Sequence, residues 1–544
     1  MFCPKCGVEN ADGAAFCSAC GNALNPAPVE DVAPVTENAA ETVAQTPKKD
    51  FLAPVKPLLE KVKPFLEKNK LFVFAGAGVL ALVLCIVLLC SLFAGGNGYT
   101  AYKHNIKVMV EDGEVFVIYD AKKAKGTGLE AEGIDHTQTS MDGSILVLLT
   151  DEGTLAFVKG NKLTKIAEEV TGFIISVDGT GVAYVVENDD SDTLMLYNVK
   201  NKKAKKVTDW LSDDNIALSP NGDSVAYYQQ KEDDEDQTLM FFKGSKSTKV
   251  TSSEVTLLGM SNNGKLIYVM GEDDEGISYL YRYNTKGDRN KIGKCDVPYV
   301  YFNEDHTQIG YYQTDDGYKT YISTNGKEGK KIASAIAAPM MPRSVEPFDG
   351  GYTATIPTDE LYNKVYTCTG EKDSIWFIRK NADRSQKLVG STRRATISED
   401  CKLVYYIDDG ELKVLTVKKG DNAADKAKVL AEDVDSYIVT SNGKKLYYTA
   451  DEGLYCINAK TGKGKKTIAN DDVKSQLYIN DKDVVYYMMD GDAYATKNGA
   501  KGKKVVTDAT SITSTANGIV YIKNDDAIFA TKGAKKPAKI HSYE

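Results

Sequence analysis

The stretch Ser219-Pro-Asn-Gly-Asp-Ser-Val-Ala-Tyr-Tyr228 decides the fold of this 544-residue chain. Its first half carries turn chemistry, because Asn-Gly accepts the positive φ angles of a tight turn. Its second half is β-branched and aromatic, which favours a strand. The chain repeats this order of turn and strand many times after residue 139, so the sequence predicts a mainly β protein.

Eight further copies of the pattern follow the same order of residues. They begin at Ser140, Ser176, Asn262, Asn303, Ser398, Ser441, Asn480 and Ala516. The first strand tyrosine of each copy, or Leu148 in its place, falls at residues 148, 184, 227, 268, 311, 405, 447, 486 and 521. The single step of 94 residues predicts a hidden repeat near Ser374–Arg379, and the other steps are near forty. Such a period, with several short strands per repeat, is typical of β-propeller blades.

Each copy resembles the blade of TolB-type β-propellers, whose core reads Ser-Pro-Asp-Gly, two variable residues and an apolar strand. The match is closest at Ser219–Tyr227, and the resemblance extends over about residues 106–544. It implies a β-propeller-like repeat domain at residues 99–544 and no catalytic residue. About ten repeats exceed a single ring of up to eight. We therefore expect one or two rings, with an internal boundary or insert near residues 333–351.

Residues 71–94 are a continuous apolar run without charge. A helix of that length would be about 36 Å long, which is enough to cross a hydrocarbon core of about 30 Å. The sequence therefore predicts one transmembrane helix. Some seventy residues precede it, which argues against a cleaved signal peptide.

Lysines are concentrated on one side of this run. Seven precede it, at positions 48, 49, 56, 61, 63, 68 and 70, whereas only Lys103 and Lys107 follow within twenty residues. The positive-inside rule then places the N-terminus in the cytoplasm. We expect a single-pass cell-membrane protein, N-in and C-out, with an extracytoplasmic repeat domain.

The N-terminus carries two Cys-x-x-Cys pairs, Cys3 with Cys6 and Cys17 with Cys20. Four thiolates at this spacing suit a tetrahedral, structural Zn²⁺. Residues 1–24 resemble the short zinc-ribbon domain at the N-termini of many bacterial membrane proteins, and this resemblance implies the same four ligands. Free thiolates also suit a reducing cytoplasm.

Two segments join the zinc ribbon to the span. Residues 25–50 are rich in Ala, Pro, Val, Thr and Glu without hydrophobic periodicity, so we expect a disordered linker. Residues 51–70 form a basic juxtamembrane segment in which Val55–Lys61 and Val62–Lys68 are similar heptads. An amphipathic segment at the membrane surface and a solvated spacer both fit this pattern.

The charge balance limits the partners. The formal net charge is −9, and Lys5 is the only basic residue of the zinc ribbon. An acidic body repels phosphate backbones, so no nucleic-acid partner is expected. Protein partners are predicted on both faces of the membrane.

Residues capable of catalysis are scarce. The four histidines, His104, His136, His306 and His541, have no metal-type spacing, and His306 occupies a turn that we expect at the surface. Acidic clusters at residues 187–192, 232–236 and 272–275 lack the order of a calcium loop, so we interpret them as solvated hairpin tips. Cys295, Cys368, Cys401 and Cys456 show no pairing pattern and are expected to be buried thiols.

These observations favour a non-enzymatic protein. The prediction is an external propeller that binds a protein, a peptide or a wall ligand, and a cytoplasmic zinc ribbon for protein interaction, acting as a sensor or scaffold. One alternative is an extracytoplasmic lyase or glycosidase, which would need carboxylates with His or Arg at one mouth of the ring. The other is a structural envelope-assembly factor.

Overall fold

The computed structural model describes residues 99–188, 191–231, 236–315, 317–349, 353–369, 373–380, 385–417, 426–533 and 536–543. The chain divides into two compact units, Met1–Cys90 and Ser91–Glu544, and every described residue belongs to the second. The predicted zinc ribbon, linker, juxtamembrane segment and transmembrane helix lie outside the described residues. Within the described part, no helix is long and apolar enough to cross a membrane.

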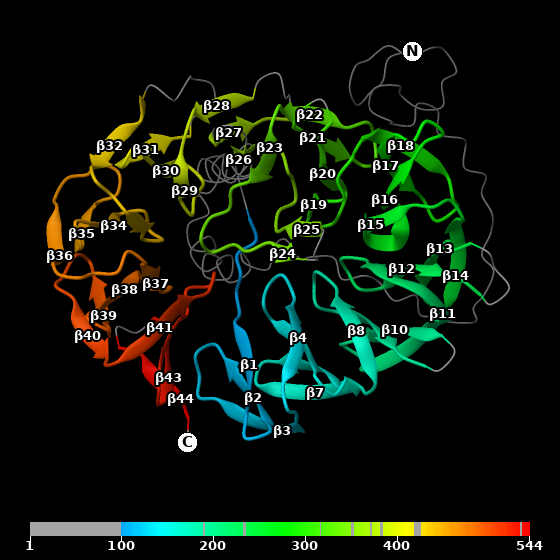
Figure 1. Ribbon diagram of the computed structural model, residues 1–544, viewed down its shortest axis with the longest axis horizontal. Coiled ribbons are helices and arrows are strands. Elements are labelled where there is room, and N and C mark those ends of the chain that lie inside the picture. The colour runs from blue at the N-terminus through cyan, green and yellow to red at the C-terminus, as the bar shows by residue number, and fades with distance from the viewer. Residues whose placement is uncertain are drawn as a thin grey trace, which may run out of the picture. The chain divides into compact units, whose positions relative to one another are not determined.

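The described residues confirm the mainly β class, with one short 3-10 helix, η1 (Asn262–Gly264). They form eleven consecutive repeats of antiparallel strands. Within a repeat each strand pairs with the next one in the chain, except that β23 pairs with β26. Most repeats have four strands, whereas repeat 1 begins at the second strand position. Figure 1 shows the first strands toward the middle and the fourth strands on the outside.

The first strands are β4 (Ile134–Thr139), β8 (Val170–Ile175), β11 (Lys203–Leu218), β15 (Thr256–Met260), β19 (Val300–Asn303), β23 (Ile336–Pro339), β29 (Arg393–Ile397), β33 (Ser436–Val439), β37 (Tyr478–Ile479) and β41 (Ala509–Ser514). The second strands are β1 (Ile106–Glu111), β5 (Ile145–Thr150), β9 (Gly181–Val186), β12 (Ser224–Gln229), β16 (Ile267–Glu272), β20 (Gln308–Gln313), β26 (Lys364–Thr369), β30 (Leu403–Asp408), β34 (Lys445–Ala450), β38 (Val484–Met489) and β42 (Val520–Asn524).

The third strands are β2 (Glu114–Tyr119), β6 (Leu155–Lys159), β10 (Asp192–Asn198), β13 (Thr238–Lys243), β17 (Ser278–Tyr283), β21 (Lys319–Thr324), β27 (Ser374–Ile378), β31 (Glu411–Thr416), β35 (Gly453–Asn458), β39 (Asp492–Lys497) and β43 (Ala527–Thr531). The fourth strands are β3 (Lys125–Glu130), β7 (Lys162–Ala167), the first part of β11, β14 (Lys246–Thr251), β18 (Arg289–Lys294), β22 (Lys330–Ala333), β28 (Gln386–Val389), β32 (Lys428–Ala431), β36 (Lys466–Ala469), β40 (Lys503–Val506) and β44 (Ala538–Ser542).

Strand β11 belongs to two repeats. Its first residues pair with β10 and its last residues pair with β12, which joins repeats 3 and 4 into one seven-stranded sheet. Two further short strands, β24 (Phe348–Asp349) and β25 (Thr353–Ile356), extend the sheet of repeat 6, because β25 lies parallel to β19.

The turn before each second strand explains the sequence repeat. The buried Ser140 hydroxyl accepts a hydrogen bond from the Ile145 amide at 3.1 Å, and Ser176 does the same for Gly181 at 2.9 Å. The side chain therefore satisfies a backbone donor where the new strand begins. Three copies begin one residue earlier than the sequence suggested, at Ser261, Thr440 and Thr515.

The recurring tyrosines lie in the hydrophobic core. All nine of the residues used to measure the period are buried. The hidden repeat is repeat 7, in which Tyr366 of β26 takes the tyrosine position and the segment near Trp376 forms β27. Repeat 1 was missed, because its second strand carries Val108 where the other repeats carry tyrosine or, in repeat 2, Leu148.

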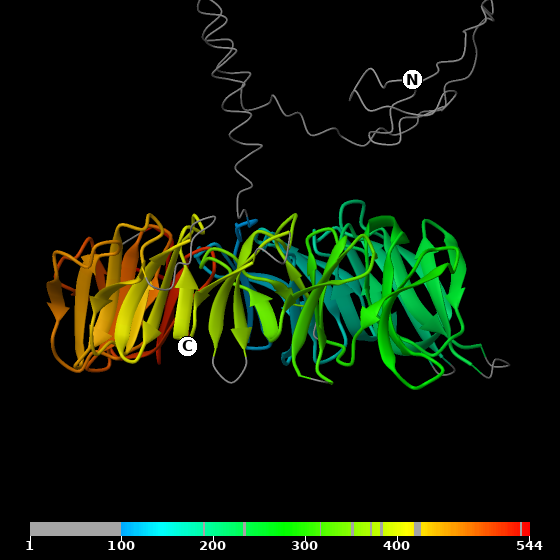
Figure 2. The ribbon, with the colours of Figure 1, turned by 90° about the horizontal axis from the view of Figure 1, so that it is seen from above.

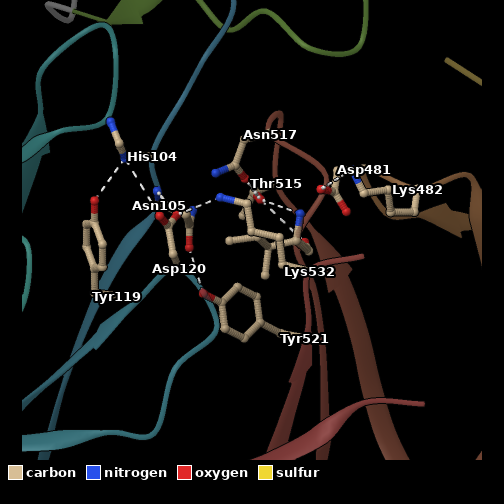
Figure 3. A network of polar contacts seen from close by, with 11 residues as sticks. His104, Asn105, Tyr119, Asp120, Asp481, Lys482, Thr515, Asn517, Tyr521 and Lys532 are labelled. Atoms are coloured by element: carbon tan, nitrogen blue, oxygen red, sulfur yellow. Dashed lines mark hydrogen bonds and ion pairs between the residues drawn. The ribbon is translucent and has the colours of Figure 1, made fainter. Parts of the chain in front are cut away.

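Ten buried clusters hold neighbouring repeats side by side, one between each repeat and the next. The eleventh cluster packs the last repeat on the first, where Ile519 and Tyr521 meet Ile118. At this seam, shown in Figure 3, the Tyr521 hydroxyl donates to Asn105 Oδ1 at 2.7 Å. Figure 2 shows the repeats side by side in one layer, with their strands running from one face of that layer to the other.

Residues 333–351, singled out as a boundary or insert, leave the run of repeats after β23. We call residues 340–349 and 353–359 the central segment. Arg343 donates to the Ile479 carbonyl of repeat 10 at 3.2 Å, whereas Phe348 packs in the cluster between repeats 2 and 3. The Tyr102 amide also donates to the Ser344 carbonyl at 2.9 Å. The central segment therefore connects repeats far apart in the sequence.

The four scattered cysteines are free and buried, as predicted. Burial raises the pKa of the Cys295 and Cys368 thiols to about 12 and that of Cys401 to about 11. Such thiols stay protonated at neutral pH, so these cysteines contribute to packing and not to nucleophilic chemistry.

Candidate functional site: an acidic cavity

A cavity of about 1910 Å³ lies beside the first strands of repeats 2 to 5 and the central segment. Strands β4, β8, β11 and β15 contribute much of its wall. Among them, β4 is exposed or half-buried throughout, whereas the second strand β5 beside it is buried throughout. Strand β4 therefore has one edge in its sheet and one side open to the cavity.

The charges on the wall have one predominant sign. Among the described residues, seven carboxylates line the cavity: Glu187, Asp192, Asp213, Glu254, Glu272, Asp274 and Glu346. Arg289 is the one arginine of that lining, which includes no lysine. A concave surface lined by one sign of charge focuses its field and attracts ligands of the opposite sign. The cavity therefore suits a cationic ligand.

Two of the predicted acidic hairpin tips contribute to this lining. Glu187 follows β9, and Glu272 ends β16, so both lie at turns between second and third strands. The sequence interpretation as hairpin tips is right, but the interpretation as merely solvated loops is incomplete. Side chains at these tips face a shared cavity that only the arrangement of the repeats creates.

The wall also offers apolar contacts. Phe173, Phe348 and Met270 line the cavity between the carboxylates. The Phe173 ring lies 5.4 Å from the His136 ring, measured between centroids. Binding sites typically combine apolar surface with a few polar groups that fix orientation. The aliphatic stem of a lysine or arginine could pack on these side chains while its charge meets a carboxylate.

His306 is a buried part of the wall and not the surface turn residue that the sequence predicted. The turn itself is real, because His306 has a φ of 55°. Its Nδ1 lies 3.0 Å from the Met260 carbonyl oxygen, and its Nε2 lies 2.8 Å from the Thr355 hydroxyl. Burial lowers its pKa to about 4. At neutral pH, Nδ1–H therefore donates to the carbonyl, and Nε2 accepts from Thr355.

This histidine connects the central segment to the repeats. Thr355 belongs to β25, and Met260 ends β15 of the preceding repeat. The His306 ring stacks on Phe302, with 4.3 Å between centroids. The position of β25 beside the cavity thus depends on a neutral imidazole.

The predicted zinc ligands Cys3, Cys6, Cys17 and Cys20 lie outside the described residues. In the described part of the chain, no group of three or more His, Cys, Asp or Glu side chains could hold a metal ion. The four histidines do not come together: His104 contacts Tyr119 at the seam, and His541 contacts Glu111 in repeat 1. Sequence reasoning missed the cavity because its residues come from five separate repeats.

A family model of the zinc-ribbon domain matches residues 2–24. No curated protein matches the sequence. Solved structures with similarity include the eukaryotic initiation factor, at 9% identity and a TM-score of 0.39 over 68% of this chain and 97% of that chain. The tricorn protease is 13% identical, with a TM-score of 0.24 over 71% and 46% of the two chains. A protein described as TolB from Agrobacterium tumefaciens is 16% identical, with a TM-score of 0.28 over 39% and 85%.

Proposed function

We propose that this chain is a single-pass membrane protein whose external repeat domain is a β-propeller that binds a cationic protein segment or peptide in its acidic cavity. The observation that carries the proposal is the cavity of about 1910 Å³ with seven carboxylates and one arginine on its described wall. The uncharged run at residues 71–94, with lysines before it, supports the membrane anchor and its direction.

The zinc ribbon supplies the cytoplasmic half of this proposal. The family model at residues 2–24 supports a metal-stapled module, and the donor set of four cysteines fits Zn²⁺. A ribbon joined to the membrane by a flexible linker transmits no rigid motion. It acts by recruiting or clustering a protein partner when the external domain is occupied.

The cavity proposal is tested with the full-length protein in detergent and two labelled peptides, one lysine-rich and one glutamate-rich. The lysine-rich peptide is expected to bind, and raising the salt concentration should weaken it. The triple variant Glu187→Gln, Glu272→Gln, Glu346→Gln removes three negative charges that come from three different segments of the cavity wall. Its affinity should fall about tenfold, which corresponds to about 1.4 kcal/mol.

The matched control is Glu168→Gln, Glu328→Gln, Glu432→Gln, three exposed side chains outside the cavity lining. It changes the net charge equally and should retain the affinity. If both triple variants bind alike, or if the glutamate-rich peptide binds as well, the cavity is not the site.

An extracytoplasmic lyase or glycosidase is the second candidate, because the cavity has the carboxylates, His136 and Arg289 that such an enzyme needs. A carboxyl that acts as general acid requires burial that raises its pKa. Six of the seven carboxylate residues are exposed, and Asp192 is half-buried, so binding is the better conclusion. Conversion of a bound ligand into products would support the enzyme, and assembly of the envelope without any cavity ligand would support a structural role.

Metal analysis tests the zinc ribbon. The full-length protein, purified at neutral pH under reducing conditions, should contain one zinc per chain, because deprotonated thiolates bind it. Cys17→Ser, Cys20→Ser should contain none, and the repeat domain should unfold as before. The control Cys85→Ser, Cys90→Ser should keep its zinc. A wild-type protein free of zinc would refute the assignment.

A further inference from the structure

The outer surface of the repeats carries a charge that the net charge conceals. The eleven fourth strands, taking residues 203–211 of β11, which pair with β10, contain eighteen lysines and two carboxylates, Glu130 and Asp209. All eighteen lysines are exposed. We call them the lysine belt. The whole chain has 76 acidic and 67 basic residues. The excess of lysine over carboxylate on the fourth strands therefore reflects the placement of the charges and not the overall composition.

The segregation is radial. In the part of the chain that the structure describes, the first strands, taking residues 211–218 of β11, contain no lysine. They line a cavity with seven carboxylates, whereas the belt lies on the strands that Figure 1 shows on the outside. A lysine thus recurs at the outer edge of every repeat, which gives a basic surface that continues from repeat to repeat.

Most of the belt is available to a ligand. Among the described residues, four of its lysines form ion pairs, namely Lys165, Lys206, Lys291 and Lys504. Lysine on an edge strand also prevents pairing with another sheet. Protection of a sheet edge requires charged side chains but not charges of one sign. It therefore does not explain why a chain with excess carboxylates places only Glu130 and Asp209 among these lysines.

We propose that the lysine belt binds a linear, phosphate-bearing polymer of the cell envelope. Repeated ammonium groups along a path match repeated phosphates, and each contact releases counterions. Lysine is a point charge without the fixed fork of arginine, which suits binding that does not depend on ligand orientation. The fourth strands contain no Phe or Tyr, and their one Trp, the half-buried Trp210 of β11, is too little for a stacking platform for nucleic-acid bases. This surface is distinct from the cavity and does not depend on the cavity's ligand.

The test uses the full-length protein in detergent and inorganic polyphosphate of about 100 units. The belt variant is Lys428→Glu, Lys466→Glu, Lys503→Glu, in repeats 8, 9 and 10. The control is Lys402→Glu, Lys444→Glu, Lys482→Glu, in exposed turns of the same three repeats. Both variants lower the net charge by the same amount. The belt variant keeps a charged residue at each substituted outer strand, and the control leaves the outer strands unchanged.

The wild-type protein is expected to bind polyphosphate, and the belt variant about tenfold or more weakly. Its log–log salt slope should be smaller by about 2, since each lost contact contributes about 0.7. The control should bind within about threefold of wild type. The neutral variant Lys428→Gln, Lys466→Gln, Lys503→Gln provides the same comparison if the charge reversal prevents folding.

Three results would overturn the proposal. Equal losses in the belt and control variants would show that net charge alone determines binding. Unchanged binding in both belt variants would leave the lysines as protection of the sheet edges. Tighter binding of a single-stranded oligonucleotide with the same number of phosphates would identify a nucleic acid as the partner.

Discussion

Acidification from pH 7 to about pH 4.5 is expected to destabilise the repeat domain by about 2 kcal/mol through one side chain, His306. Its pKa lies near 4 in the folded protein, against an ordinary value of 6.5. The unfolded chain therefore binds more protons between these two values, so stability is full above pH 6.5 and falls as the pH approaches 4. The neutral ring accepts from Thr355, and protonation would replace that acceptor with a second donor.

Equilibrium urea unfolding at the two pH values measures this loss. His306→Asn keeps a residue that tolerates the left-handed backbone but cannot titrate. The variant should be less stable at pH 7, because it loses the stacking on Phe302, yet the His306 share of the pH dependence should disappear. His136→Asn, an exposed control, should retain it. An unchanged pH dependence in His306→Asn would contradict the assignment.

Gly181→Ala is expected to cost about 3 kcal/mol or to prevent folding of repeats 3 and 4. A Cβ on Gly181 would lie 2.4 Å from the carbonyl oxygen and 2.5 Å from the Cα of Gly222. Both are backbone atoms of the neighbouring turn, which cannot move aside as a flexible side chain would. The turns are also joined by the Thr180 hydroxyl, which donates to the Asn221 carbonyl at 2.8 Å. Overpacking at such a contact is strongly destabilising.

Gly172→Ala is the matched control. Gly172 lies in β8 of the same repeat, and no heavy atom lies within 4 Å of a Cβ built on it. It should leave stability unchanged or raise it slightly, since alanine restricts the unfolded chain. Fluorescence of Trp210, which lies in β11, can follow urea unfolding of this region in both variants. Equal stability of the two variants would show that the turns separate at little cost.

Much of the fold was predictable from the sequence, because each repeat closes locally. A turn that begins with Ser, Thr or Asn and ends in an apolar strand is visible as a pattern, and its period indicates how many strands share a repeat. The two repeats that escaped the pattern each lack one of its parts. In repeat 7 the central segment separates the first strand β23 from the second strand β26, and repeat 1 has Val108 at the tyrosine position.

The candidate site was less predictable, for a physical reason. Glu187, Glu272 and Glu346 are far apart in the sequence, and each alone fits a solvated loop. Only the side-by-side packing of repeats brings them to one cavity. His306 carried no signal either, because a histidine in a turn is usually exposed. The lysines of the outer strands were visible in the sequence, but the overall acidity concealed them until the fold separated inner from outer strands.

The seam between the last and first repeats has a consequence for folding. Contacts between neighbouring repeats join residues roughly forty apart, whereas Tyr521 and Asn105 are separated by 416 residues. Contacts of such sequence separation form late, because the entropy of closing the chain must be met first. During synthesis, the apolar face of repeat 1 around Ile118 therefore stays exposed until the final repeat has left the ribosome. The joining of the last repeat to the first is the step at which a folding helper would protect this chain from association with another nascent copy.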